Sequence, residues 1–521
     1  MVPKENKMKH CMKKINLALT ALCIFGSALS AGLLHAAESD KPATTGKPNI
    51  LFLFADDWAW PHASCLGDPV VKTPTFDRMA KEGVMFVNAH SAAPSCSPSR
   101  AAILTGQWPW RLSEGANLSG WLPARFDVYP DLLEKSGYFV GKMGKGYGPG
   151  GLGDRTQNPA GKDYKSFDKF LKERPKGQPF CFWLGSHHPH RPYKLGSGVQ
   201  SGMNPDKVVV PPYLPDTPEV RSDICDYYHE VQYYDQTECA EAIAALERTG
   251  ELDNTIIVMS GDNGWPFPRG KATNYDTGTH QTLAVRWGAK VKPGRTVTDF
   301  VSLSDLAPTF LEAAGVPIPK TMTARSLMPQ LLSQASGQVD PTRDHVLTCM
   351  ERHTDRQSEN GSHIEGYPRR TIFTKDFHYI RNFYPDRWMA GNPRGFEVPG
   401  ATPFSWQDLI KGTRSGFSDI DASPTKAWVV LHRGDEKIKP LADVILGHHP
   451  ARELYDLRKD PYELTNVAED PAYAGDVRML DQRLMTELKV TADPRAQAGG
   501  VELDTLPDKD KTDSHKGKKK R

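Results

Sequence analysis

The chain has 521 residues, which is too many for one small core and enough for a large domain with a smaller one beside it. Its 65 basic residues nearly balance its 63 acidic residues, so no overall field attracts a nucleic acid, and we expect no nucleic-acid partner. Composition therefore excludes a strongly basic or strongly acidic binding protein, and function has to come from the motifs.

The first 37 residues are typical of a secretory signal peptide. Lysines precede the apolar stretch INLALTALCIFGSALSAGLL, and small residues follow it as a cleavage site. An uncleaved membrane anchor is the alternative, because the stretch is long enough to span a bilayer, although its glycines and serines favour removal. We therefore expect a secreted or periplasmic protein, with a polar linker over residues 38–47.

Three unbroken apolar runs predict strands that are buried on both faces, at residues 49–54, 180–185 and 255–261. Amphipathic helical patterns lie between them, including one that starts at Cys239. Strands that alternate with such helices predict an α/β sandwich around a mostly parallel sheet. We assign residues 48–385 to this domain.

The pattern of apolar runs weakens after about residue 385. It recovers in the stretches AWVVLHR and RELYDLRKDPYELTNVA, which predict a small α+β subdomain over residues 386–490. The last residues, 491–521, are rich in charge and poor in apolar side chains, and we expect a disordered tail there.

Polar side chains follow the predicted strands at the edge where ligands collect in an α/β sheet. Asp56 and Asp57 come directly after the first strand, and Asp262 and Asn263 after the third. Singly, each is equally well explained as a helix cap or turn residue. Together their oxygens form a set that suits Ca²⁺ before Mg²⁺ and is poor for zinc. The sequence therefore predicts a hard-cation site.

A histidine group, SHHPHR, follows the second predicted strand. Its spacing crowds the imidazoles onto a turn with no thiol nearby, so we do not expect zinc. His187 is the better candidate for a proton donor or an anion contact. His190 is a further candidate for substrate contact, or a solvated loop residue. Lys145 and Lys271 lie near glycines that allow close ligand approach, although loop lysines are often only solvated.

The stretch SAAPSCSPSRAAILTG places a cysteine at the start of a predicted helix. Ser97 is the expected N-cap, Pro98 the first helical residue and Gly106 the stop. Cys96 would then lie at the positive end of the helix dipole with Arg100 one turn further along, which favours an activated sulfur. A helix-start cysteine near a surface arginine is the alternative.

These motifs resemble the type I, formylglycine-dependent sulfatases. CSPSR is similar to the family's C-x-P-S-R signature, and ADDW and DNG are similar to its metal-binding segments. The resemblance implies an alkaline-phosphatase-like fold, a calcium ion held by the four oxygen ligands and residue 96, and oxidation of Cys96 to formylglycine by a maturation enzyme. One oxygen of the hydrated aldehyde would attack sulfur, and the other would allow release of sulfate.

The resemblance also implies roles for the remaining candidates. Arg100 would orient the finished nucleophile, and Lys145, His187 and Lys271 would contact the sulfate, with His187 or Lys271 helping the leaving group depart. One position departs from the family: Tyr147 stands where a histidine is usual. Collapse of the intermediate would then depend on this tyrosine, another histidine or water.

Within the family, VVVPPYLPDTPEVRSD and SGDNGWPFPRGKATNY are most similar to the heparan N-sulfatases, which implies an N-sulfoglucosamine-type substrate in a sulfated saccharide. Two alternatives stay open. One is a phosphonate or phosphate ester hydrolase of the same superfamily, and the other is a catalytically lapsed protein that binds sulfated glycans, which Tyr147 would mark. The complete CSPSR signature argues against the second. The sequence does not predict the oligomeric state.

Overall fold

The first predicted strand forms β1 (Asn49–Ala55) in the computed structural model, inside a mixed sheet of eight strands among the described residues. In spatial order the sheet consists of β3 (Phe139–Gly144), β4 (Phe180–Gly185), β1, β5 (Thr255–Gly261), β6 (His280–Arg286), β2 (Val84–His90) and β7 (Arg295–Val297), with β8 (Val301–Ser302) beside β2. All neighbours are parallel except the pairs that β6 makes with β5 and β2. The expected mostly parallel sheet is confirmed.

The structure describes residues 46–354, 364–393, 395–396 and 403–508. The predicted signal peptide and most of the linker lie outside these ranges. Within them, no helix has both the length and the apolar character that crossing a membrane requires.

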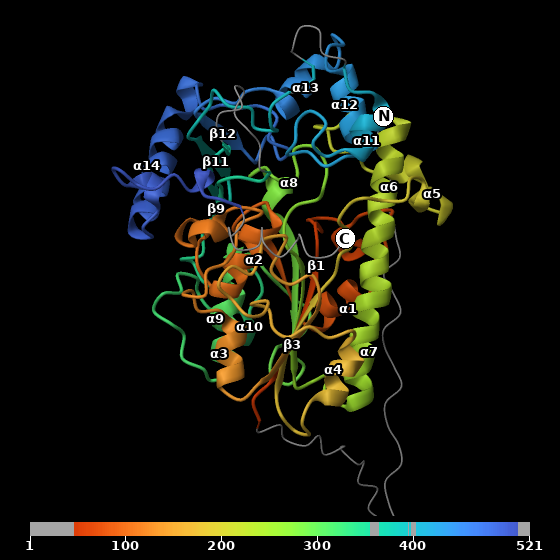
Figure 1. Ribbon diagram of the computed structural model, residues 1–521, viewed down its shortest axis with the longest axis vertical. Coiled ribbons are helices and arrows are strands. Elements are labelled where there is room, and N and C mark those ends of the chain that lie inside the picture. The colour runs from red at the N-terminus through yellow and green to blue at the C-terminus, as the bar shows by residue number, and fades with distance from the viewer. Residues whose placement is uncertain (1–45, 355–363, 394, 397–402, 509–521) are drawn as a thin grey trace, which may run out of the picture. The chain divides into compact units, whose positions relative to one another are not determined.

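All residues of β1 are buried, and alternate ones face two different hydrophobic clusters. The cluster that contains Leu51 and Leu53 includes side chains of α1 (Pro74–Glu82), α4 (Phe167–Glu173), α6 (Pro218–Tyr233) and α7 (Ala240–Thr249). The cluster that contains Phe52 and Phe54 includes side chains of α2 (Cys96–Thr105), α3 (Tyr129–Lys135), α9 (Leu306–Ala313) and α10 (Met328–Leu332). A helical layer on each face explains why the strand is apolar throughout, and Figure 1 shows the two layers.

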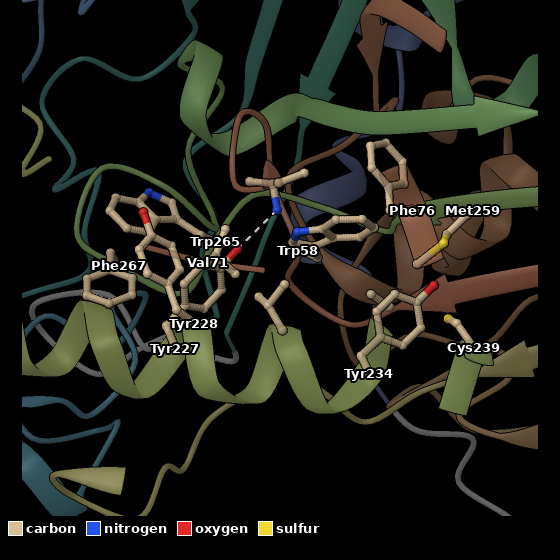
Figure 2. Packing of buried hydrophobic residues seen from close by; sticks show 14 of the residues in the cluster. Trp58, Val71, Phe76, Tyr227, Tyr228, Tyr234, Cys239, Met259, Trp265 and Phe267 are labelled. Atoms are coloured by element: carbon tan, nitrogen blue, oxygen red, sulfur yellow. Dashed lines mark hydrogen bonds between the residues drawn. The ribbon is translucent and has the colours of Figure 1, made fainter. Parts of the chain in front are cut away.

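The helix expected to start at Cys239 is the last part of a longer one. A π-helical turn over Tyr234–Cys239 joins α6 to α7 without a break. Inside this turn the Asp235 carboxylate accepts the backbone N–H groups of Thr75 and Phe76, so it caps α1 from outside. Figure 2 shows the tyrosines of this helix on the side that faces the aromatic side chains of Trp58 and Trp265.

A second sheet is antiparallel and has the order β12–β11–β10–β9 among the described residues. Its strands are β9 (His345–Met350), β10 (Arg369–Thr374), β11 (Phe377–Asn382) and β12 (Arg452–Asp456). The predicted boundary at residue 385 falls inside this sheet, because three of its strands precede that residue. The second region therefore starts near residue 345, and its strands pair across a long insertion that no local pattern reveals.

The remaining helices are short except one. They are α5 (Ser197–Gln200), α8 (Asp276–Thr279), α11 (Trp406–Lys411), α12 (Pro424–His432), α13 (Lys439–Leu446) and α14 (Ala474–Val490). The tail that was expected to be disordered from residue 491 is ordered as far as Asp508. Asp493 and Asp504 in it are buried, and they bind Arg370 and Arg495. Buried ion pairs thus hold a segment that looks like a solvated tail by composition.

Candidate active site

The ends of β1 and β5 bring the predicted metal ligands together. Asp56, Asp57, Asp262 and Cys96 are buried, and each offers a ligand atom within 4.8 Å of the others. Asn263 Nδ2 donates to Asp57 Oδ1 at 2.7 Å, whereas its Oδ1 is buried with no hydrogen-bond partner among the described residues. An unpartnered buried oxygen beside three carboxylates fits a hard divalent cation, because such an atom is costly unless something binds it.

The backbone at Asp57 links the segments that follow β1 and β5. Asp57 has a left-handed conformation, with φ of 73°, which aspartate tolerates better than most residues. Its N–H donates to Asp262 Oδ1 at 2.9 Å. The segment after β1 is thereby fixed to the segment after β5, and both carboxylates lie on the same side of the sheet edge.

Cys96 begins α2 itself, two residues earlier than the sequence suggested. Ser95 is the N-cap, in an extended conformation, and Pro98 is the third helical residue. Proline fits there because the N–H groups of the first turn have no helical partner anyway. Gly106 ends the helix in a left-handed conformation, as predicted, and its N–H donates to the Ala102 carbonyl.

The surroundings of the Cys96 thiol act against the activation that the helix dipole predicts. Its Sγ lies 3.4 Å from Asp56 Oδ1, and the residue is 1% exposed. Burial and then the Asp56 carboxylate raise the pKa of the thiol well above its ordinary value. Both effects favour the protonated thiol over the thiolate.

Arg100 is fully buried, which removes the interpretation of a surface arginine. Its Nε donates to Asp262 Oδ2 at 2.7 Å. Its Nη1 donates to the carbonyls of Lys145 and Gly146 at 2.9 and 3.0 Å. The guanidinium thus ties α2 to the end of β5 and to the loop after β3, and it fixes the orientation of the helix that carries Cys96.

Two lysines complete the balance of charge. Lys145 Nζ donates to both oxygens of Asp56 at 2.8 and 2.6 Å, and Lys271 Nζ donates to Asp57 Oδ2 at 2.8 Å. Burial alone would raise the pKa of Asp56, but the neighbouring cations, Lys145 foremost, lower it well below its ordinary range. Each buried carboxylate of the site therefore has a cationic partner.

The three histidines after β4 diverge. His187 is exposed, and its pKa is lowered by partial burial. His188 turns toward Glu230 of α6, with 2.5 Å between Nδ1 and the carboxylate. His190 faces the site, because its Nε2 lies 3.9 Å from Asp57 Oδ2 while its Nδ1 contacts the next backbone carbonyl. The geometry thus favours a site position over a solvated one for His190.

Tyr147 does not occupy a catalytic position. The side chain is 4% exposed and belongs to a hydrophobic cluster, and its hydroxyl donates to the Gly120 carbonyl at 2.9 Å. Burial raises its pKa above the ordinary value. The hydroxyl is committed to a backbone partner, so the tyrosine does not replace the family histidine, and another histidine or water remains for that task.

Two further side chains reach the site without any signal in the sequence. Asp421 Oδ2 lies 3.2 Å from Lys271 Nζ, although 150 residues separate them. His353 Nδ1 lies 2.9 Å from the hydroxyl of Ser95, the residue before Cys96. Burial would lower the pKa of Lys271, but Asp421 and Asp57 raise it well above its usual value, so this lysine is held as an ammonium.

Residues 48–316, more than half of the chain, match the family model described as Sulfatase. The chain therefore belongs to the sulfatase family, and the expected alkaline-phosphatase-like fold is confirmed.

N-sulphoglucosamine sulphohydrolase of Homo sapiens is 28% identical to this chain over 508 residues, which covers 86% of this chain and 91% of the relative. An ulvan-active sulfatase of Formosa agariphila is 28% identical over 469 residues and covers 87% and 82%. A solved structure in complex with its substrate, D-glucosamine-2-N,6-O-disulfate, is 20% identical with a TM-score of 0.57 and covers 86% of this chain and 99% of its own. At that identity the likeness concerns the fold.

Proposed function

We propose that the chain releases sulfate from a sulfated saccharide, with a hydrated formylglycine made from Cys96 as nucleophile and Ca²⁺ as cofactor. The observation that carries the proposal is the convergence of Asp56, Asp57 and Asp262 on Cys96, with an open Asn263 oxygen beside them. The Cys96 side chain lies within 4.8 Å of the three carboxylates, so an oxygen nucleophile made from it would lie beside the cation that these residues would hold.

Asp56, Asp57, Asp262 and Asn263 Oδ1 would hold the calcium, and residue 96 would complete the set. A divalent ion bound there supplies a Lewis acid for the nucleophilic oxygen and for the sulfate. Protein oxygens in a buried cage suit Ca²⁺, whereas Mg²⁺ usually keeps several waters.

The remaining roles follow from the positions of the charged side chains. Lys145 and Lys271, which are paired with Asp56 and Asp57, would contact the sulfate from their ammonium groups. Arg100, locked by Asp262, orients residue 96. His187 is the exposed group at the edge, so it can deliver a proton to the leaving atom and regain one from solvent.

We favour an N-sulfoglucosamine-type substrate. The similarity to the human N-sulphoglucosamine sulphohydrolase supports this choice, because it extends over most of both chains. The segment that follows β5 also supports it, since its Lys271 occupies the site. The ulvan-active relative has the same identity, so sulfate esters belong in any test.

The test uses matured protein with calcium and compares four substrates: N-sulfoglucosamine, an O-sulfated glucosamine, an aryl sulfate and an aryl phosphate diester. We expect sulfate release, most rapidly from N-sulfoglucosamine. Dominant phosphodiester hydrolysis would replace this function with the ester hydrolase alternative, and no turnover on any substrate would favour a glycan-binding protein. Mass spectrometry of the peptide across Cys96 establishes beforehand whether the aldehyde is present.

We further propose that the protein is secreted or periplasmic and that the signal peptide is removed. The lysines and the apolar stretch before residue 38 support this. Sequencing the N-terminus of the exported protein tests it.

A further inference from the structure

Asp421 brings an acidic group from the C-terminal region to the edge of the candidate site. Its Oδ2 lies 3.2 Å from Lys271 Nζ, and its side chain is 13% exposed. Its Oδ1 makes no hydrogen bond to any described residue. One oxygen is therefore committed to a sulfate-contacting lysine, and the other is an open acceptor beside it.

The segment that carries Asp421 is anchored on both sides. Lys426 Nζ is buried and donates to the Ile420 carbonyl at 2.8 Å, directly before Asp421. The Thr425 hydroxyl donates to Asp223 Oδ2 of α6 at 2.6 Å. Buried contacts, one of them to α6, thus hold the segment of Asp421 in place, so the position of Asp421 does not depend on Lys271 alone.

An open carboxylate beside an anion contact discriminates between donors and acceptors. It repels the lone pairs of an oxygen and attracts an N–H group. In a sulfamate the bridging nitrogen carries a hydrogen, whereas the bridging oxygen of a sulfate ester has only lone pairs. The two substrate classes therefore differ at the bridging atom that joins the sulfate to the sugar. In the proposed function Lys271 contacts the sulfate, which brings this bridging atom near Asp421.

We propose that Asp421 is a specificity-determining residue, which selects a sulfamate over a sulfate ester by accepting the N–H of the bridging nitrogen. This inference rests on the proposed function and deepens its substrate preference. In the reaction an oxygen of the hydrated formylglycine forms a bond to sulfur, the S–N bond breaks with its electron pair left on nitrogen, and nitrogen takes up a proton to leave as an amine. The sulfate then departs with that oxygen, and water replaces it on residue 96. Asp421 neither gains nor loses a proton. The released amine takes a second proton from solvent, and Asp421 then faces the ammonium form of the product.

The variant Asp421→Asn tests this directly. Its amide oxygen can stay on Lys271 while its NH₂ group takes the place of the open acceptor, so a donor faces the bridging atom. We expect kcat/KM for N-sulfoglucosamine to fall about 10- to 100-fold, while kcat/KM for an aryl sulfate stays within about threefold or rises. Asp419→Asn is the matched control: the Asp419 carboxylate contacts Thr354 instead, and we expect both substrates to be affected within about threefold.

A binding measurement gives a readout that does not depend on turnover. Calorimetry with unmatured protein compares glucosamine, which carries an ammonium, with glucose, which carries a hydroxyl. We expect the wild type to prefer glucosamine by about tenfold and Asp421→Asn to lose this preference.

Equal losses on both substrates in Asp421→Asn would mean that Asp421 acts only through Lys271, and would overturn the inference. No loss on either, or no preference for glucosamine in the wild type, would overturn it as well. Wild-type protein that cleaves esters and not the sulfamate would overturn the inference and leave the sulfatase function standing. Matured wild-type protein that releases no sulfate from any substrate would overturn the proposed function itself.

Discussion

The two walls of the candidate site are built on different physical principles. The sheet wall consists of residues that follow strand ends or lie in the first half of α2 and are all buried: Asp56, Asp57, Cys96, Arg100, Asp262 and Asn263. The C-terminal wall consists of His353 and Asp421, which reach the site from beyond residue 345. In the first wall each carboxylate has a cation, and in the second a carboxylate oxygen is left open.

This difference separates chemistry from recognition. Groups that are buried and compensated in pairs have one stable arrangement, since moving either partner leaves a charge unpaired in a medium of low dielectric constant. Such a wall suits a cation and a nucleophile. A partly exposed carboxylate with an open oxygen keeps a hydrogen bond for the substrate. We therefore expect changes in the sheet wall to abolish turnover or folding, and changes in the C-terminal wall to alter the choice of substrate.

Replacing Cys96 is the strongest test of the sheet wall. We expect Cys96→Ala to lower turnover by more than about 10⁴-fold, because the nucleophile is lost. The fold should persist, since alanine is compatible with the first turn of α2. Sulfate release and thermal unfolding measure the two effects. Cys96→Ser should be equally inactive in a host that matures only cysteine, and wild-type-like activity in either variant would refute the proposed nucleophile.

Removing Asp262 tests whether compensation holds the sheet wall together. Asp262→Ala removes the carboxylate that pairs with the buried Arg100 guanidinium and the acceptor of the Arg100 Nε–H and the Asp57 N–H, so we expect a loss of about 3–5 kcal/mol in the free energy of unfolding. Calcium binding measured by calorimetry should weaken as well. Asp216→Ala breaks an exposed carboxylate–arginine pair with Arg221 and serves as the control, with an expected loss of about 1 kcal/mol or less. Equal effects in both variants would contradict the role of burial.

The sheet wall was predictable because strand ends are local features. A buried apolar run indicates a strand, and the polar residues that follow such runs meet at one edge of a parallel sheet. This rule predicts that Asp56 and Asp262 lie close together. In the structure their sequence neighbours, Asp57 and Asn263, are hydrogen-bonded although 206 positions of the sequence separate them. The start of α2 was misplaced by two residues, because Pro98 fits any position of the first helical turn.

The C-terminal wall was not predictable from periodicity. Asp421 follows no strand, and its position depends on long-range contacts of the neighbouring Lys426 and Thr425. The predicted start of the second region, at residue 386, was wrong for a similar reason. The strands of the second sheet pair across an insertion, so only the complete sheet shows where the region begins. Nothing local distinguishes such residues from ordinary loop residues.

A smaller test is the dependence of the free energy of unfolding on acid pH, which concerns a buried histidine in the segment after β1. His62 follows β1, is buried, and its Nδ1 lies 3.2 Å from the Tyr227 hydroxyl of α6. Burial lowers the pKa of His62 to about 4. Between about pH 6.5 and pH 4 the unfolded chain therefore binds a proton that the folded chain does not bind. The free energy of unfolding should therefore fall as the pH drops from about 6.5 to about 4, by up to about 3 kcal/mol.

Denaturant unfolding at several pH values measures this slope. His62→Gln cannot be protonated and keeps an acceptor for Tyr227, so its slope over the same interval should be shallower than that of the wild type. His448→Gln alters an exposed histidine and is the matched control, expected to keep the wild-type slope. If both variants keep it, burial of His62 is not a source of acid sensitivity.

Replacing Tyr147 should have the smallest effect on turnover, and it tests whether a residue outside the two walls takes part in the reaction. Its hydroxyl is bonded to the Gly120 carbonyl, so Tyr147→Phe leaves a buried carbonyl without that partner and should cost about 1–2 kcal/mol of stability. Turnover per folded molecule should stay within about threefold, because the hydroxyl takes no part in the reaction. Steady-state kinetics and thermal unfolding on the same preparation separate the two quantities. If a folded variant instead turns over substrate more slowly by about two orders of magnitude, the loss expected for a general acid or base, Tyr147 belongs to the catalytic machinery and His187 alone does not supply the proton chemistry.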